Sequence, residues 1–321
     1  MLISFVIPVR KYTRSGVDPL RCLCAEMRRE GIDAEIIVVE GRAPSRQRNE
    51  GVLAAKGEII YFLDDDVRIT EEHFRVLLEL YADDKVGAAG GPVTAPQGAS
   101  LQERVFGGLF ASFFGGCAVR YRHKAIGGLR PADENMLILA NLSIRKKIFD
   151  SLCGGFREDL YPNEENELIV RLKQKGFGVF YAPELEAERT LRKTLPSFVR
   201  MCLRNGRGRA DCIFANSATL RPFYLVPAFF VIYLLSLFWL KRPVFFLPVL
   251  LYLVLDVVFS AVIALRTANL PGIFISLLGF PCMHIFYGIG FLSALPGNLF
   301  RKIFRSVRGP APGGISIIRL P

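Results

Sequence analysis

The stretch Gly57-Glu-Ile-Ile-Tyr-Phe-Leu-Asp-Asp-Asp-Val-Arg-Ile69 decides the fold, because an apolar run leads directly into three consecutive carboxylates. Residues 59–63 follow a glycine and carry only apolar or aromatic side chains, which is typical of a central parallel strand covered on both faces. Open α/β sheets bind ligands beyond the carboxyl ends of such strands. An extended backbone would point Asp64 and Asp66 to one side and Asp65 to the other. The stretch therefore predicts two carboxylates converging at a sheet edge.

Two converging carboxylates repel each other by about 1 kcal/mol at roughly 4 Å in bulk water, unless a cation lies between them. A divalent metal suits this position, since Mg²⁺ commonly takes one or two protein carboxylates and completes its shell with water and phosphate oxygens. Asp64 and Asp66 are therefore candidate ligands of Mg²⁺ or Mn²⁺. A solvated acidic turn is the alternative that this stretch alone leaves open.

The segments around this strand alternate between strand and helix patterns. We expect strands at 2–9, 34–39, 59–63, 86–93 and 136–144, and helices at 18–30, 44–56, from about Thr70, and from Asn163. This alternation predicts parallel βαβ units with right-handed crossovers. The helix after Asn163 carries three acids in its first turn, Glu164, Glu165 and Glu167. By pattern alone, these acids would simply complement the positive end of the helix macrodipole.

The last third of the chain is strongly apolar. Residues 222–240, 243–265 and 270–300 contain one formally charged residue, Asp256, and each stretch is long enough to cross a membrane. Helices of a soluble core seldom remain so free of charge over about 20 residues, so we predict membrane association. Asp256 should face protein or water, because a carboxylate near the centre of a span is costly.

The net charge of +11 at pH 7 indicates anionic partners. Arginines gather just before the apolar part, where anionic lipid would attract them. No nucleic-acid motif is visible in the soluble part, so nucleic acid is not expected as a partner. Seven cysteines form no disulfide pattern, and Cys22 and Cys24 have no histidine near them in the sequence that would complete a zinc site.

Several motifs, taken in their order along the chain, resemble the family-2 inverting glycosyltransferases with the GT-A fold. They are Phe5-Val-Ile-Pro-Val9, Ile37-Val-Val-Glu40, Arg48-Asn-Glu-Gly51, Phe62-Leu-Asp-Asp-Asp66, and Gly155-Phe156 followed by Glu164-Glu165 and Arg171-Leu172-x-x-x-Gly176. The resemblance covers about residues 1–210. It implies a Rossmann-like, mostly parallel α/β domain followed by membrane helices.

The resemblance also implies roles for residues of this sequence. Pro8, Val9, Glu40, Arg48, Asp64, Asp65 and Asp66 would bind a UDP- or GDP-sugar donor, with Asp66 and Asp64 holding the metal. Glu165 would be the base that deprotonates the acceptor, with Glu164 and Glu167 as its alternatives on the same helix. Arg204 and Arg207 would contact the diphosphate, although lipid head groups are an equally good partner for them. The acceptor would be lipid-linked or a growing polysaccharide.

Three residues or motifs depart from the family pattern. Glu40-Gly-Arg-Ala replaces the usual acidic base-binding loop, which leaves the nucleotide preference open, and Glu165 stands where Asp is usual. The change at Glu165 motivates one alternative function, a membrane-bound subunit that binds nucleotide-sugar without catalysis. The other alternative is a processive polysaccharide synthase, which would need the closing Gln-x-x-Arg-Trp motif that residues 200–205 lack.

The domain organisation expected from the sequence has four parts. A glycosyltransferase domain spans 1–210, a basic connector 211–221, two or three membrane helices 222–300, and a basic tail 301–321. We expect a multi-pass protein of the cytoplasmic membrane whose catalytic domain faces the cytoplasm. Three spans would separate the basic tail from that domain, against the positive-inside rule, so either 222–240 lies in the interface or 270–300 is re-entrant.

Overall fold

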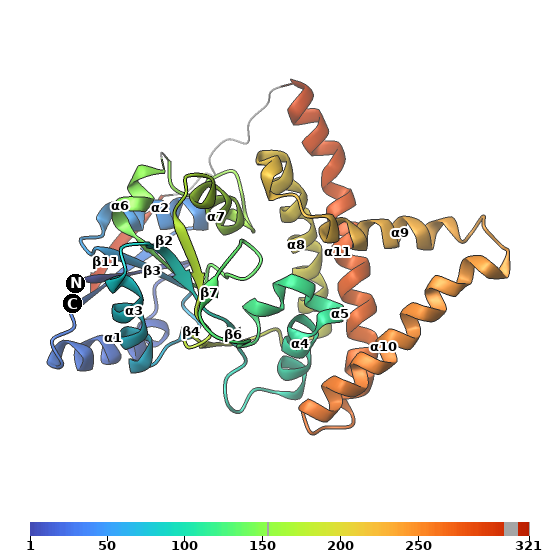
Figure 1. The fold of residues 1–321 in the computed structure, drawn as a ribbon, viewed down its shortest axis with the longest axis horizontal. Coiled ribbons are helices and arrows are strands. Elements are labelled where there is room, and N and C mark those ends of the chain that lie inside the picture. Colours follow the sequence, from blue (N-terminus) through green and yellow to red (C-terminus); the bar gives the residue numbers. More distant parts are fainter. Residues whose placement is uncertain (153, 305–313, 321) are drawn as a thin grey trace. The chain divides into compact units, whose positions relative to one another are not determined.

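The computed structural model of the chain describes residues 1–152, 154–304 and 314–320. These residues form two compact units, which are described separately (Figure 1). The first unit contains residues 1–94 and 121–189 together with the C-terminal strand, and the second contains residues 95–120 and 190–304. The expected break at residue 210 therefore differs from the observed division, which interleaves the two units along the chain.

The first unit is a mixed α/β structure, as the sequence indicated. Its helices are α1 (Arg14–Arg29), α2 (Pro44–Ala54), α3 (Glu71–Ala82), α6 (Lys146–Ser151) and α7 (Glu164–Gln174). Its strands are β1 (Ile3–Val9), β2 (Ala34–Glu40), β3 (Ile59–Leu63), β4 (Val67–Arg68), β5 (Val86–Gly90), β6 (Val93–Thr94), β7 (Arg130–Pro131), β8 (Asn141–Arg145), β9 (Gly178–Tyr181), β10 (Ala187–Arg189) and β11 (Ser316–Leu320).

The larger sheet of the described residues has the strand order β11-β2-β1-β3-β8-β5-β9-β7. Strands β1, β2, β3, β5 and β9 run in one direction, while β7, β8 and β11 run against them. Val9 pairs with Glu40, and Val6 pairs with Phe62, so the carboxyl ends of the first three strands meet at one edge. A short second sheet has the order β4-β10-β6.

Apolar side chains cover both faces of this sheet, which explains why its central strands carry continuous apolar runs. Helices α1 and α3 pack on one face around Phe5 and Tyr61, and α2, α6 and α7 pack on the other around Phe62 (Figure 1). Gly51 lets α2 approach the sheet closely, since a Cβ there would lie 2.4 Å from a methyl carbon of Val6.

Two local expectations need adjustment. The strand expected at 136–144 is shorter and later, since β8 begins at Asn141 after a turn whose Met136 N–H donates to Asp133 O. The region 97–134, which had no clear pattern, contains α4 (Leu101–Ala111), α5 (Phe113–Gly116) and a 3₁₀ helix (Cys117–Arg122). The helix expected after Asn163 is confirmed as α7, and Asn163 itself has a φ of +81°, a conformation that Asn tolerates better than most residues.

The second unit is helical. Besides α4 and α5 it contains α8 (Leu195–Ala215), α9 (Val226–Ser236), α10 (Leu247–Arg266) and α11 (Gly272–Phe304), with 3₁₀ turns at Ser217–Thr219, Pro222–Leu225 and Pro243–Phe246. Helices α8 and α11 pack tightly through glycines, because Gly206 faces the backbone of Tyr287 and Gly290 faces that of Leu203. Aromatic packing joins α4 to α8, where the rings of Phe106 and Phe198 stack 4.4 Å apart.

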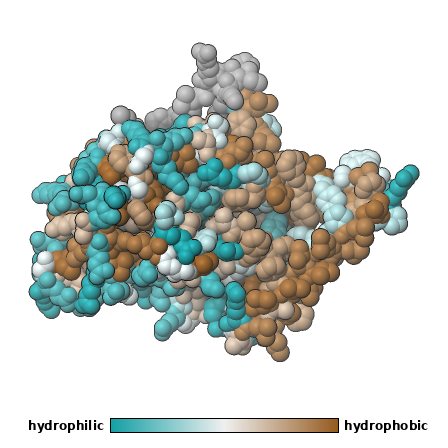
Figure 2. Space-filling view, viewed as in Figure 1, coloured by the Kyte–Doolittle hydropathy of each residue, from teal (hydrophilic) through white to brown (hydrophobic). Residues whose placement is uncertain are grey.

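Two helices of the described residues are long and apolar enough to be candidate membrane spans, at 243–266 and 272–300. Helix α9 has 11 residues, and a rise of about 1.5 Å per residue makes it too short to cross a bilayer core of roughly 30 Å. Helix α10 exposes large apolar side chains along its length, and Figure 2 shows the hydrophobic surface over it. Asp256 is buried within this helix and accepts a hydrogen bond from Ser260 at 3.1 Å.

The segment expected as a basic tail contains further regular structure. Helix α11 continues to Phe304, and Ser316–Leu320 forms β11, which pairs antiparallel with β2 in the sheet of the first unit. Ile318 and Leu320 pack against the apolar core that β1 and β2 share. Residues 305–313 of the expected tail lie outside the described residues, as does Cys153.

Candidate functional site

The predicted donor residues at the ends of β1 and β2 lie side by side. Val9 and Glu40 are register partners, and Glu40 Oε2 accepts a hydrogen bond from the Tyr12 N–H at 2.9 Å. The buried Gln47 of α2 closes this edge, because its amide nitrogen donates to Val9 O at 2.9 Å and to Val39 O at 2.6 Å. Pro8 and Glu40 remain partly exposed here, as residues contacting a ligand must be.

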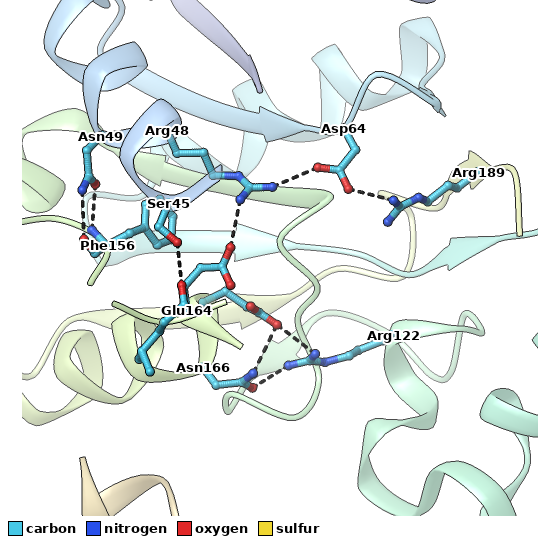
Figure 3. A network of polar contacts seen from close by, with 11 residues as sticks. Ser45, Arg48, Asn49, Asp64, Arg122, Phe156, Glu164, Asn166 and Arg189 are labelled. Atoms are coloured by element: carbon cyan, nitrogen blue, oxygen red, sulfur yellow. Dashed lines mark hydrogen bonds and ion pairs between the residues drawn. The ribbon is translucent and has the colours of Figure 1, made fainter. Parts of the chain in front are cut away.

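Arg48 of α2 connects the acidic strand end with the acidic helix. Its guanidinium donates to Asp64 Oδ1 at 3.0 Å through Nη2 and to Glu164 Oε1 at 2.9 Å through Nη1 (Figure 3). Arg48 and Glu164 are both almost fully buried. Burial raises the pKa of Glu164 above its ordinary value, and Glu165 and Asp64 add to this effect, whereas the positive charge of Arg48 opposes it. The two acidic motifs predicted from the sequence therefore belong to one network.

Asp64 and Asp66, the predicted metal ligands, are bridged by an arginine. Arg189 of β10 donates to Asp64 Oδ2 through Nη2 and to Asp66 Oδ1 through Nε, both at 2.9 Å. Burial opposes ionisation of Asp64, but Arg189 and Arg48 together lower its pKa. Burial and the charges of Asp66 and Asp64 raise the pKa of Asp65.

The predicted base, Glu165, lies in a second arginine cluster at the start of α7. Arg122 donates to Glu165 Oε1 at 3.0 Å and to Asn166 Oδ1 at 2.6 Å, and Asn166 donates back to Glu165 at 3.2 Å (Figure 3). Further hydrogen bonds hold Arg122 to the carbonyl oxygens of Glu134 and Asn135. The guanidinium of Arg122 and the side-chain amide of Asn166 thus fix the orientation of the Glu165 carboxylate.

Glu167, the third acid, faces a different part of the structure. Arg171, one turn along α7, donates to both of its carboxylate oxygens at 2.9 Å. The same guanidinium also donates to Leu152 O and to O of Gly155, the residue that begins the Gly155-Phe156 motif before the acidic helix. These contacts give Glu167 a role in holding that loop against the helix.

Helix α2 also anchors the segment that leads from Gly155 to the acidic helix α7. The Asn49 side chain makes two hydrogen bonds of 2.9 Å with the backbone N–H and C=O of Phe156, and Ser45 donates to Leu160 O at 2.8 Å (Figure 3). One face of a single helix therefore fixes both the acidic strand end and the segment 155–164.

The donor set around Asp64 and Asp66 is compatible with a metal that arrives with a diphosphate. No group of three or more His, Cys, Asp or Glu side chains that could hold a metal occurs in the described part of the chain. Two carboxylates nevertheless match the small protein contribution that is usual for Mg²⁺ when phosphate and water complete the shell. The oxygens in question are those that accept from Arg189, so the fit requires that guanidinium to move.

Arg204 and Arg207 belong to the second unit, which is described separately from the site. Both lie on α8 in the second unit, where their side chains are exposed and Arg207 donates to Ser293 at 3.3 Å. Their predicted contact with the diphosphate stays a prediction.

His123 is half-buried near the arginine clusters, and burial together with Arg122 and Arg189 lowers its pKa to about 3, so it is neutral at physiological pH.

Sequence reasoning missed three residues of this site, namely Gln47, Arg122 and Arg189. Arg122 lies in the basic run 120–124, which could be noticed but not assigned a partner. Arg189 is far from Asp66 in sequence and reaches it only because β10 pairs antiparallel with β4, with Arg189 opposite Val67. Only a prediction of that strand pair would have found it.

A search of the curated proteins found no match. The family model described as glycosyl transferase family group 2 matches residues 59–260. That match begins at the strand leading into Asp64, includes the whole of α7, and spans more than half of the chain. The match explains why an acidic strand end, an acidic helix and apolar C-terminal helices follow one another in this order along the chain. The chain belongs to glycosyl transferase family group 2.

Proposed function

We propose that the protein is a membrane-attached inverting glycosyltransferase that moves a sugar from a UDP- or GDP-sugar to a lipid-linked or growing polysaccharide acceptor. The observation that supports this most strongly is the chain of contacts Asp64–Arg48–Glu164, which joins the expected donor edge of the sheet to the acidic helix. A transferase needs its donor carboxylates and its base on two sides of one reacting carbon. This network supports the proposal because it ties Asp64 to the helix that carries the proposed base, Glu165.

In the proposed reaction, Glu165 accepts the proton of the acceptor hydroxyl. The hydroxyl oxygen then bonds to the anomeric carbon as the bond from that carbon to the diphosphate oxygen breaks, and the electron pair leaves with the diphosphate. Arg122 and Asn166 would orient the Glu165 carboxylate toward the acceptor. A single displacement of this kind inverts the configuration at the anomeric carbon.

A divalent metal held by Asp66 and Asp64 would supply Lewis-acid stabilisation of the departing diphosphate. Glu40 and the backbone at the end of β1 would contact the nucleoside, where Gln47 keeps the two strand ends together. Arg48 would keep Asp64 ionised and oriented. Glu164 would serve mainly as the buried anchor of Arg48, and Glu167 as the anchor of the loop through Arg171.

The membrane attachment follows from the exposed apolar surface of α9 and α10. Exposed apolar side chains include Phe229 of α9 and Leu251 and Val254 of α10, and such a surface is unfavourable in water. The pairing of β11 with β2 in one sheet supports a topology in which the chain before and after the apolar helices would lie on one side of the membrane. We place that side in the cytoplasm, where the basic residues near the helices are favoured.

The test is release of nucleoside diphosphate from a panel of nucleotide sugars by the full chain purified in lipid extract. We expect release from one donor class, loss with EDTA, and a decrease of at least about 100-fold in Asp66→Ala and in Glu165→Gln. Asp84→Ala and Glu72→Gln change exposed carboxylates of the same unit and should keep wild-type rates.

The outcome that contradicts the proposal is release that persists with EDTA and in both variants, or no release from any donor with lipid acceptors present. Polymer formed from donor alone would favour a processive synthase instead. Nuclear magnetic resonance of the product decides the stereochemistry, since retained anomeric configuration would exclude the single displacement.

A further inference from the structure

The guanidinium of Arg189 occupies the position between the two aspartates where a shared cation would be expected. It bridges Asp64 Oδ2 and Asp66 Oδ1 with two different nitrogens, each 2.9 Å from its carboxylate. The forked geometry of arginine suits such bridging, which a lysine ammonium reproduces poorly. The pairing of β10 with β4 fixes the Arg189 backbone next to this acidic segment.

This bridge removes the like-charge repulsion that the sequence predicts for Asp64 and Asp66. Asp64 is neutralised twice, because its second oxygen accepts from Arg48. Asp66 has one described cationic partner, Arg189, and its side chain is the more exposed of the two at 38% against 22%. An approaching divalent cation would therefore meet Asp66 first and would have to break the contacts of Arg189.

We propose that Arg189 is a displaceable counter-ion of the Asp64–Asp66 pair, which holds both carboxylates in place and yields them to the metal that enters with the donor diphosphate. This inference rests on the proposed metal-assisted transfer. Arg189 is a positioning residue in this scheme. When no donor is present, its guanidinium competes with the metal for the two carboxylates. A bound diphosphate compensates for the broken contacts, because it adds its own oxygen ligands to the metal and offers the released guanidinium a new anionic partner.

The consequence is that metal and donor bind together. In wild-type protein, Mn²⁺ alone should bind weakly, because it must break two charge-assisted hydrogen bonds without compensation. Addition of nucleoside diphosphate should strengthen Mn²⁺ binding. Removing Arg189 should strengthen binding of Mn²⁺ alone by about tenfold or more and reduce this coupling.

The experiment measures bound Mn²⁺ by electron paramagnetic resonance on the purified full chain without any donor. The variants are Arg189→Gln, Arg189→Lys, the double variant Arg189→Gln with Asp66→Asn, and the control Arg75→Gln, which removes an exposed arginine of α3. We expect tighter binding in Arg189→Gln, an intermediate effect in Arg189→Lys, loss of the gain in the double variant, and wild-type binding in Arg75→Gln. Equal or weaker Mn²⁺ binding in Arg189→Gln would overturn the proposal.

A second measurement uses the wild-type chain and so does not depend on the folding of a variant. Phenylglyoxal modifies accessible guanidinium groups, and mass spectrometry of the digested protein reports its rate at Arg189 and at Arg75. Saturating Mn²⁺ alone should accelerate modification of Arg189 several-fold and leave Arg75 unchanged. An unchanged rate at Arg189 would contradict displacement. If nucleoside diphosphate release remains metal-dependent in that case, the proposed function stands and only the role of Arg189 fails.

Discussion

Four carboxylates of the candidate site are held by arginines. The pairs are Asp64 with Arg48 and Arg189, Glu164 with Arg48, Glu165 with Arg122, and Glu167 with Arg171. Removing one partner from a buried pair typically costs about 3–5 kcal/mol, because the other charge remains buried without compensation. The individual acids are therefore distinguished by their partners more than by their spacing on the helix.

Glu164 provides a pH-dependent test at the residue scale. Its pKa is raised chiefly by burial, so the folded protein holds this proton to a higher pH than the unfolded chain does. The stabilisation from the bound proton is complete below the ordinary Glu pKa of about 4.3 and is lost as pH rises through the raised value. We expect the thermal stability of the wild type to fall over this window relative to Glu164→Gln, which cannot ionise.

The measurement is the apparent melting temperature of both proteins between about pH 4.5 and 8, a range that runs from the ordinary Glu pKa of about 4.3 to beyond the raised pKa of about 7. Glu72→Gln, which removes an exposed carboxylate of α3, serves as the control and should run parallel to the wild type. A difference between wild type and Glu164→Gln that stays constant over the whole range would show that Glu164 does not titrate abnormally.

At this scale the sequence was informative where the chemistry is local. Three consecutive aspartates after an apolar run identified the acidic strand end, and Arg48 was placed near it. Arg122 and Arg189 were not found, because their partners are 43 and 123–125 positions away and are reached only through the folded chain. Residues of this kind carry no pattern in their own neighbourhood.

Among the elements, α2 has the largest organising role. This short helix begins at Pro44 and contacts the sheet closely at Gly51. Polar residues between these two positions hold the segment 155–164. The sequence predicted this helix almost to its boundaries. It did not predict β8 correctly, because the apolar residues 136–140 look like a strand although they form a turn that is buried by tertiary packing.

The contact between α8 and α11 gives a test at the element scale. A Cβ on Gly206 would lie 2.0 Å from the carbonyl oxygen of Tyr287, so Gly206→Ala must push two helix backbones apart. We expect a loss of about 1–3 kcal/mol, as for other overpacked sites. Gly297→Ala is the matched control, since no atom lies within 4 Å of a Cβ there and alanine favours the helix by roughly 0.5–1 kcal/mol.

The measurement compares apparent melting temperatures of the two variants in the same detergent. Gly206→Ala should melt several degrees below the wild type, and Gly297→Ala at or slightly above it. Equal melting temperatures for the two variants would mean that α8 and α11 do not pack at Gly206 as described.

For the whole molecule, the composition of the chain predicted a catalytic α/β part and an apolar helical part, and both are present. The division between them was not predicted, because residues 95–120 belong with helices that follow a hundred residues later. The return of the chain to the first unit was also missed. Ser316–Leu320 is too short a segment to be recognised as a strand without its partner β2.

That return bears on the proposed membrane topology. Strand β11 pairs with β2 along its whole length, from Ser316 opposite Glu40 to Leu320 opposite Ile36. Because the strands of one hydrogen-bonded sheet lie on the same side of a bilayer, we predict that the helices between residues 222 and 304 cross an even number of times or not at all. We expect epitope tags placed before residue 1 and after residue 321 to be cleaved together by protease in opened vesicles, and to be protected together in sealed vesicles whose cytoplasmic face is inside. A resident membrane protein of known orientation is the control. Protection of one tag and cleavage of the other would contradict the pairing of β11 with β2 in the membrane-bound protein and would restore an odd number of spans.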